Sequence, residues 1–194
     1  MRHDYSVDGF RFRIRPIEIK DASFVVKLRN DPELSKYLHR GAQDEASQRA
    51  WIEQYYAREN DYYFVVEHLS NREPEGLVAV YDIDGDEDTA EWGRWILVNG
   101  SLAAVESCWL VYKFAFDVID LGSVYCRTVG ENESVVSFHD STGATRVRNI
   151  PGHFSIDGRV FDAVEHRVDK ANWPTINQKL QFLAQRLAKK YSHD

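Results

Sequence analysis

The sequence lacks most of the features that mark a specialised class of protein. It contains only two cysteines among 194 residues, Cys108 and Cys126, and two thiols build neither a disulfide framework nor a cysteine-based zinc site. No apolar run reaches the roughly 18–20 residues that a membrane span needs, and the N-terminus lacks the apolar stretch of a signal peptide. These absences predict a soluble protein of the reducing cytoplasm that does not enter a membrane.

An excess of basic residues is also missing. The 24 lysines and arginines stand against 31 aspartates and glutamates, which gives a formal net charge of −7. This balance argues against a nucleic-acid binder, which normally carries a basic excess, and it fits a basic acceptor weakly. No Gly-x-Gly-x-x-Gly marks a dinucleotide-binding turn. The acidic stretch 82–88 lacks the spacing of an EF-hand loop, so no metal site is expected.

What the sequence does contain is a series of short strand and helix patterns in a chain that is 43% apolar. Its length fits one domain. Period-two and β-branched patterns predict strands, and helical spacing of apolar residues predicts helices. The predicted strands are 10–15, 62–67, 76–81, 89–98, 123–129 and two within 144–168 joined at Asp157-Gly158. The predicted helices are 22–29, 44–58, 101–119 and 131–142. This order predicts an α+β fold with a sheet of mixed direction.

A further amphipathic helix is predicted at the C-terminus. Thr175 and Gln178 fit a capping box. The apolar stripe that follows repeats every three or four residues and comprises Trp173, Ile176, Leu180, Leu183, Leu187 and Tyr191. We therefore interpret residues 171–194 as a helical extension of the domain formed by residues 1–170. Dimerisation or docking on a partner through this helix stays open at this stage.

Three segments together resemble one family. They are the strand pattern 90–98, the strand–helix pattern 127–143 and the hairpin pattern 154–164, and the opening residues 14–16 and 28–34 fit as well. In order and spacing they resemble the GNAT superfamily of acyl-CoA-dependent N-acyltransferases. The branch resembled includes ribosomal-protein N-terminal acetyltransferases and acetyltransferases of nucleotide-linked amino sugars. The resemblance covers roughly residues 10–168.

The resemblance implies a three-layer fold: a central, mostly antiparallel sheet splayed at two parallel strands, helices on both faces, and the extra C-terminal helix. It implies acetyl-CoA or another acyl-CoA as co-substrate. Gly93, which is costly inside a strand unless it marks a bulge or a close approach, would splay the strands. The pyrophosphate would lie at the start of the helix near Ser101. Residues implied to bind the co-substrate are Trp95, Ile96, Leu97, Gly100, Ser101, Leu102, Ala103, Ala104, Asn132 and Ser134.

Two side chains carry the implied catalysis. His139 stands where many members have a tyrosine that protonates the leaving thiolate, and an imidazolium can give up a proton in the same way. Glu91 is the candidate base, directly or through a water. The alternatives are a helix-face histidine bonded to backbone and an exposed strand carboxylate. Glu106 is expected to face away from the phosphates, because its charge would repel them.

The sequence thus predicts an N-acyltransferase that moves an acetyl or other short acyl group to a primary amine, such as a nucleotide-linked amino sugar. A protein N-terminus is the alternative acceptor. A non-catalytic binding module is the alternative from another class, because Asn99 and Leu102 depart from the family's phosphate-loop pattern. The expected partner is a small-molecule amine, without nucleic acid, membrane or metal, and a homodimer is possible.

Overall fold

One sheet of eight strands runs through the computed structural model, which describes residues 1–191. The spatial order is β1-β2-β3-β4-β5-β6-β8-β7, and every neighbouring pair is antiparallel except β5 and β6. The strands are β1 (Val7–Asp8), β2 (Phe12–Pro16), β3 (Tyr62–His68), β4 (Pro74–Asp84), β5 (Thr89–Leu97), β6 (Ser123–Val129), β7 (Thr145–Ile156) and β8 (Arg159–Asp169). The predicted mixed, mostly antiparallel sheet is confirmed.

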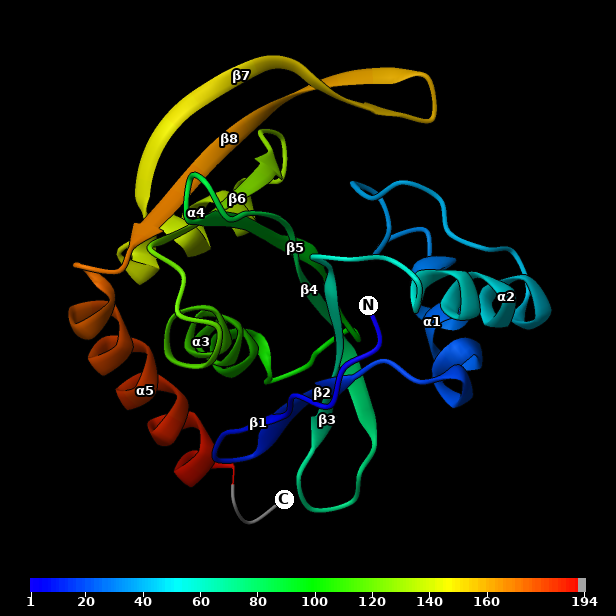
Figure 1. Cartoon of the computed structure of the whole chain (residues 1–194), viewed down its shortest axis with the longest axis horizontal. Helices are drawn as coiled ribbons and strands as arrows, with labels where there is room; N and C mark the ends of the chain where they lie inside the picture. The colour runs from blue at the N-terminus through cyan, green and yellow to red at the C-terminus, as the bar shows by residue number, and fades with distance from the viewer. Residues whose placement is uncertain (192–194) are drawn as a thin grey trace.

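Helices cover both faces of this sheet (Figure 1). One face is covered by α1 (Ala22–Arg29) and α2 (Glu45–Tyr55), and a 3₁₀ turn, η1 (Ile19–Asp21), precedes α1. The other face carries α3 (Ala104–Lys113), its π-helical continuation η2 (Phe114–Val118), α4 (Glu133–Thr142) and α5 (Trp173–Lys190). The predicted three layers are therefore present. No helix within residues 1–191 is both long and apolar enough to cross a membrane.

The central strands are buried on both sides, which explains their nearly continuous apolar sequences. On β3, Phe64 and Val66 pack toward α3, while Tyr63 and Val65 pack toward α1 and α2. Strand β4 alternates in the same way. The two faces of one strand thus feed two separate apolar cores, and a shift of one residue in register would exchange them.

The parallel pair β5–β6 is very short. Only Thr89, Ala90 and Glu91 pair with β6, and the strands part beyond Glu91. On the opposite edge of β5 the register with β4 slips between Gly93 and Ile96, so a bulge lies there, with φ of +50° at Arg94. A Cβ at position 93 would lie 2.7 Å from the hydroxyl of Tyr81. The predicted bulge at Gly93 is confirmed, although the left-handed residue is Arg94 and the close neighbour of Gly93 is the Tyr81 side chain rather than another backbone.

Several predicted helix boundaries are wrong, among them the end of α2, which is Tyr55 rather than residue 58. The helix expected from Ser101 begins at Ala104; the Ser101 hydroxyl instead accepts the N–H of Ala103 at 3.1 Å, in the turn before the helix. The capping box expected at Thr175 is absent, because α5 already begins at Trp173 with a proline in its first turn. Helix α4 begins at Glu133 and ends, as predicted, at Gly143, whose φ is +100°.

The C-terminal helix packs against α3. The indole of Trp109 donates to Asn177 at 2.7 Å, and that of Trp173 donates to Asp117 at 2.8 Å. The buried stripe differs from the predicted one at Leu183, which is 38% exposed, because Ala184 takes the core-facing position. Residues 192–194 of the predicted extension lie outside the described part of the chain.

Candidate active site

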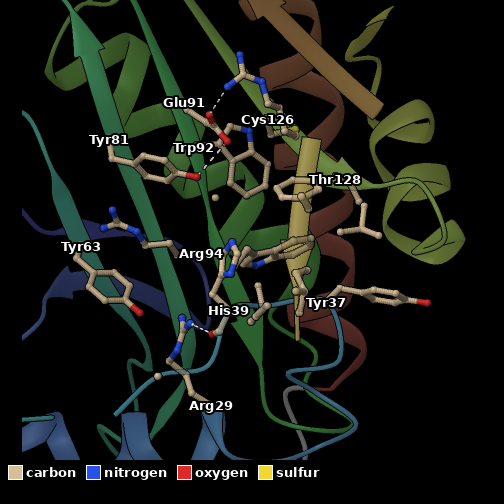
Figure 2. Close-up of a pocket in the computed structure, with 18 of the residues that line it drawn as sticks. Arg29, Tyr37, His39, Tyr63, Tyr81, Glu91, Trp92, Arg94, Cys126 and Thr128 are labelled. Atoms are coloured by element: carbon tan, nitrogen blue, oxygen red, sulfur yellow. Dashed lines mark hydrogen bonds and ion pairs between the residues drawn. The ribbon is translucent and has the colours of Figure 1, made fainter. Parts of the chain in front are cut away.

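The divergence of β5 and β6 opens into a cavity of about 510 Å³. Its walls come from the two strands, from α4, and from residues 34–42 of the connection between α1 and α2. The tip of the β7–β8 hairpin completes the wall with Phe154 and Ile156. Because the sheet has no backbone in the gap, the cavity extends from the α1–α2 face to the start of α4. Figure 2 shows its lining side chains.

Glu91 lies where the two strands part, and only 7% of it is exposed. Tyr81, its direct cross-strand neighbour on β4, donates its hydroxyl to Oε1 at 3.1 Å (Figure 2). Arg127 of β6 donates to Oε2 at 3.0 Å. Burial raises the pKa of Glu91 above its ordinary value, and the Arg127 guanidinium opposes that rise. The alternative of an exposed strand carboxylate is therefore wrong, and each oxygen keeps a lone pair for a further donor.

A second carboxylate holds Arg127 in place. The Nε of Arg127 donates to Glu165 of β8 at 2.9 Å. Arg148 of β7 donates twice to the same carboxylate, at 3.1 Å. The ion pairs thus run in a chain from the buried Glu91 on β5 across β6 and β8 to the exposed Arg148 on β7. Such a chain fixes the geometry around Glu91, because removing one member leaves a neighbouring charge buried without a partner.

His139 of α4 lies deep in the same cavity wall, with 2% exposed. Its ring packs among aromatic rings, at 5.3 Å from the ring of Trp92 and 5.3 Å from that of His166. Burial, followed by the charge of His166, lowers the pKa of His139 to about 3. The ring is therefore neutral at pH 7, which differs from the imidazolium expected from the sequence. Its Nδ1 has no hydrogen-bond partner within residues 1–191.

The residues predicted to bind the co-substrate fall into two groups. Trp95 and Asn132 line the main cavity together with Glu91 and His139. Gly100, Ser101 and Leu102 line a second hollow of about 220 Å³ in the loop before α3. The structure therefore brings the catalytic candidates together with the start of α4 and puts the predicted phosphate loop around a separate hollow.

The other predicted binding residues are occupied by packing. Ile96 is buried on the α1–α2 face, Leu97 packs against the α3 side, and Ala103 is buried. Only the backbone of this part of β5 can therefore face a ligand. Ala104 opens α3, where the first turn of a helix leaves N–H groups without a partner. Ser134 is exposed on α4 and donates its hydroxyl to Asn132 Oδ1 at 3.2 Å.

Sequence reasoning missed Tyr81 and Arg127, although the register carries a signal for both. Tyr81 and Glu91 flank the acidic turn of one hairpin and face each other directly. Glu91 pairs with Tyr125 across the parallel strands, so Arg127, two residues further on, lies on the same face of β6. A register drawn from the turn and from the parallel pair would have placed both beside Glu91.

The segment of residues 30–44 also escaped prediction as part of the site. It crosses from α1 to α2 and contacts the β7–β8 hairpin, which arches toward it in Figure 1. Tyr37 donates its hydroxyl to the carbonyl of Glu131 at 3.2 Å, and Arg40 pairs with Asp157 of the hairpin turn at 2.9 Å. The residues in these contacts are distant in sequence, and no local sequence pattern predicts that they meet.

Comparison with known proteins places this site in a family. Residues 11–145 match the family model described as an acetyltransferase (GNAT) domain, and the chain belongs to that family. It is therefore an acetyltransferase by family, and acetyl-CoA is the donor that the family uses. A comparison with curated protein sequences gives no match.

Solved structures share the fold over most of the chain. A nucleotide-linked sugar GNAT in its apo form is 28% identical over 94% of this chain and 98% of its own, with a TM-score of 0.76. A GCN5-related N-acetyltransferase from Brucella melitensis is 19% identical over 94% and 86%, with a TM-score of 0.81. The spermidine N-acetyltransferase from Vibrio cholerae in complex with CoA and spermine is 19% identical over 84% and 98%, with a TM-score of 0.76.

The low pKa of His139 predicts a pH-dependent stability. The unfolded chain binds a proton at this histidine near pH 6.5, and the folded chain does not until about pH 3. Folding stability therefore falls as pH drops below 6.5. Between pH 7.5 and pH 5, the free energy of unfolding of His139→Gln should fall by about 2 kcal/mol less than that of the parent. Urea unfolding at both pH values measures the difference, with His39→Gln as the exposed control. An equal loss in parent and His139→Gln would contradict the neutral buried ring.

Proposed function

We propose that the chain transfers an acetyl or other short acyl group from acyl-CoA to the primary amine of a small molecule. One observation carries this proposal: the two parallel strands part at Glu91 and open directly into the cavity. An extended amide-bearing chain can hydrogen-bond to strand edges that lack a partner. A buried carboxylate at the end of that gap can take a proton from an amine.

The backbone of β5 fits a pantetheine-like chain. The N–H of Val98 donates to Glu75 on β4, so the N–H of the preceding Leu97 faces away from β4 and toward the gap. Backbone N–H groups between residues 92 and 97 are the donors that we propose to polarise the thioester carbonyl. This use of the strand is supported by Ile96 and Leu97, whose side chains pack into the two cores and leave the backbone to face a ligand.

The loop before α3 also fits a phosphate group. Leu102, which stands where the family pattern has glycine, packs its side chain against the α3-side core. Gly100 has φ of +76°, and a Cβ there would meet no atom within 4 Å. The side chain of Leu102 therefore does not fill the loop, and this weakens the alternative of a binding module that has lost its chemistry.

Acyl-CoA supplies the thioester, and side chains of this protein accept the amine proton and donate a hydrogen bond to the leaving group. Glu91 accepts the proton of the attacking amine, directly or through a water, and Arg127 and Tyr81 hold its two oxygens in position. His139 is neutral and keeps its proton, so it donates an N–H hydrogen bond that stabilises the departing thiolate. The thiolate takes its proton from solvent as CoA leaves, and the proton that Glu91 took from the amine returns to solvent.

A nucleotide-linked amino sugar is the acceptor that we favour. The nucleotide-linked sugar GNAT is 28% identical to the chain, whereas the spermidine enzyme is 19% identical. Trp51, Tyr37 and Tyr63 line the cavity and offer aromatic faces on which a base or a sugar can stack.

A protein N-terminus is the second candidate acceptor. Two buried free thiols, Cys108 and Cys126, fit a reducing cytoplasm, and a homodimer stays a prediction.

Calorimetric titration with acetyl-CoA, with free CoA as control, tests the donor. We expect micromolar binding, because the unpaired strand edges and the open loop before α3 offer donors for the amides and phosphates. Binding of acetyl-CoA without release of CoA in the presence of any amine would support the binding-module alternative. The absence of heat and of thermal stabilisation with either compound would contradict the proposed donor.

Glu91→Gln tests the base. We expect kcat/KM for the amine to fall by about 100-fold or more, as is typical when a general base is removed. In the parent, activity should fall as pH drops through the raised pKa of Glu91, above 4.5, because only the ionised carboxylate accepts a proton. Glu165→Gln is the matched control, since it removes the other carboxylate bound to Arg127. Equal losses in both variants would mean that Glu91 only positions Arg127.

His139→Ala tests the group beside the sulfur. We expect kcat to fall much more than the affinity for acetyl-CoA, because the ring acts on the departing sulfur rather than on the bound donor. Steady-state rates and calorimetry on the same preparation separate the two effects. An unchanged kcat would remove His139 from the mechanism.

A further inference from the structure

The charge of the cavity is opposite to that of the whole chain. The protein carries a formal net charge of −7. Yet among residues 1–191 the cavity is lined by one carboxylate, Glu91, and by five arginines, Arg29, Arg40, Arg58, Arg94 and Arg127. Such a lining attracts anions and repels cations within the cavity, where the surface acids are screened beyond about 8 Å.

Four of these arginines have an acidic partner. Arg94 pairs with Asp61 at 2.8 Å, Arg58 lies 3.8 Å from the same residue, Arg40 pairs with Asp157, and Arg127 pairs with Glu91 and Glu165. Within residues 1–191, no carboxylate lies within ion-pair distance of the guanidinium of Arg29. Arg29 therefore contributes the one charge of this lining that the described chain does not compensate.

Arg29 is held in a defined place. It is the last residue of α1, it is half-buried, and its Nη2 donates to the carbonyl of His39 at 2.6 Å. A Cβ at Gly41 would approach its Nε to 2.9 Å, so the glycine leaves room for the guanidinium. Figure 2 shows Arg29 at the end of the cavity away from Glu91. A guanidinium has five N–H donors, and the His39 carbonyl and the neighbouring Tyr63 hydroxyl engage only part of them.

We propose that Arg29 binds a phosphoryl group of the acceptor, so that the cavity takes phosphorylated primary amines and rejects polycationic ones. The inference rests on the proposed function, since the amine must lie at Glu91 while its phosphoryl group lies at the Arg29 end. The planar fork of arginine matches phosphoryl oxygens in a bidentate manner. Arg40 and Arg58 line the same cavity and suit a ligand with more than one negative charge. A polyamine would meet these cations and find a single carboxylate that is already bonded twice.

The first test compares acceptors on the parent protein with saturating acetyl-CoA. Glucosamine 1-phosphate should be acetylated with a kcat/KM about 10- to 100-fold higher than glucosamine, the range of charge-assisted hydrogen bonds to one group. Spermidine should be the poorest of the three. Spermidine turned over as well as glucosamine 1-phosphate would overturn the proposal.

The second test assigns the effect to Arg29. In Arg29→Gln the preference for glucosamine 1-phosphate over glucosamine should fall by about tenfold or more, and Arg29→Lys should keep part of it. Arg186→Gln is the matched control, because it removes the same charge from the exposed face of α5. Equal preferences in Arg29→Gln and Arg186→Gln would overturn the role of Arg29.

A binding measurement separates this inference from the proposed function. Uridine diphosphate is titrated calorimetrically into the CoA-saturated parent, Arg29→Gln and Arg186→Gln, and the titration needs no turnover. Binding by the parent and Arg186→Gln that weakens in Arg29→Gln supports the phosphoryl site, even if no amine is acetylated. Binding that is equal in all three proteins, or absent from the parent, overturns it. Failure of every amine with intact diphosphate binding would contradict only the proposed transfer reaction.

Discussion

The parting of β5 and β6 is the constraint on which the site depends. Two parallel strands that stay paired leave no room between them, and these two stay paired for only three residues. The bulge at Arg94 turns the end of β5 away, and Gly93 permits it because the hydroxyl of Tyr81 occupies the space of a side chain. Strand edges, the start of α4 and the cavity are all consequences of that divergence. If β5 and β6 stayed paired along their whole length, the same residues would form a continuous sheet and leave no cavity.

The gap would be costly without the charges that bridge it. Glu91 and Arg127 stand on the two strands as they part, and their ion pair joins β5 to β6 where the backbone hydrogen bonds end. Glu165 anchors the arginine from the next strand. Buried ion pairs are weak sources of stability, since desolvation offsets most of the attraction. Burial raises the pKa of Glu91 and the Arg127 guanidinium opposes that rise, so the ion pair that joins the two strands also favours the ionised form of the carboxylate.

The sequence predicted the fold well wherever local pattern decides structure. Strand 123–129 was predicted to the residue, and the Asp157-Gly158 turn has both residues at positive φ, as the pattern requires. Helix starts were less accurate, because the turn before α3 and the proline in α5 compete with the simple capping signals. The structure puts the catalytic candidates Glu91 and His139 in one cavity, but both were chosen from a family resemblance rather than from local pattern. Their environment was not predictable, since the burial that lowers the pKa of His139 to about 3 comes from residues far apart in sequence.

The cavity shows why overall charge is a poor guide to a site. The acidic composition of the chain fits a basic acceptor only weakly. Inside the cavity the balance is reversed, because arginines from α1, from the segment 30–44 and from β5 and β6 converge on one space. Surface carboxylates act on the cavity through screening water, whereas Arg29 is itself part of the cavity lining. A cavity distinguishes anionic from cationic ligands through the few lining charges that have no nearby partner of opposite sign. The fold decides which those are: among residues 1–191, four of these arginines have an acidic partner within ion-pair distance and Arg29 has none.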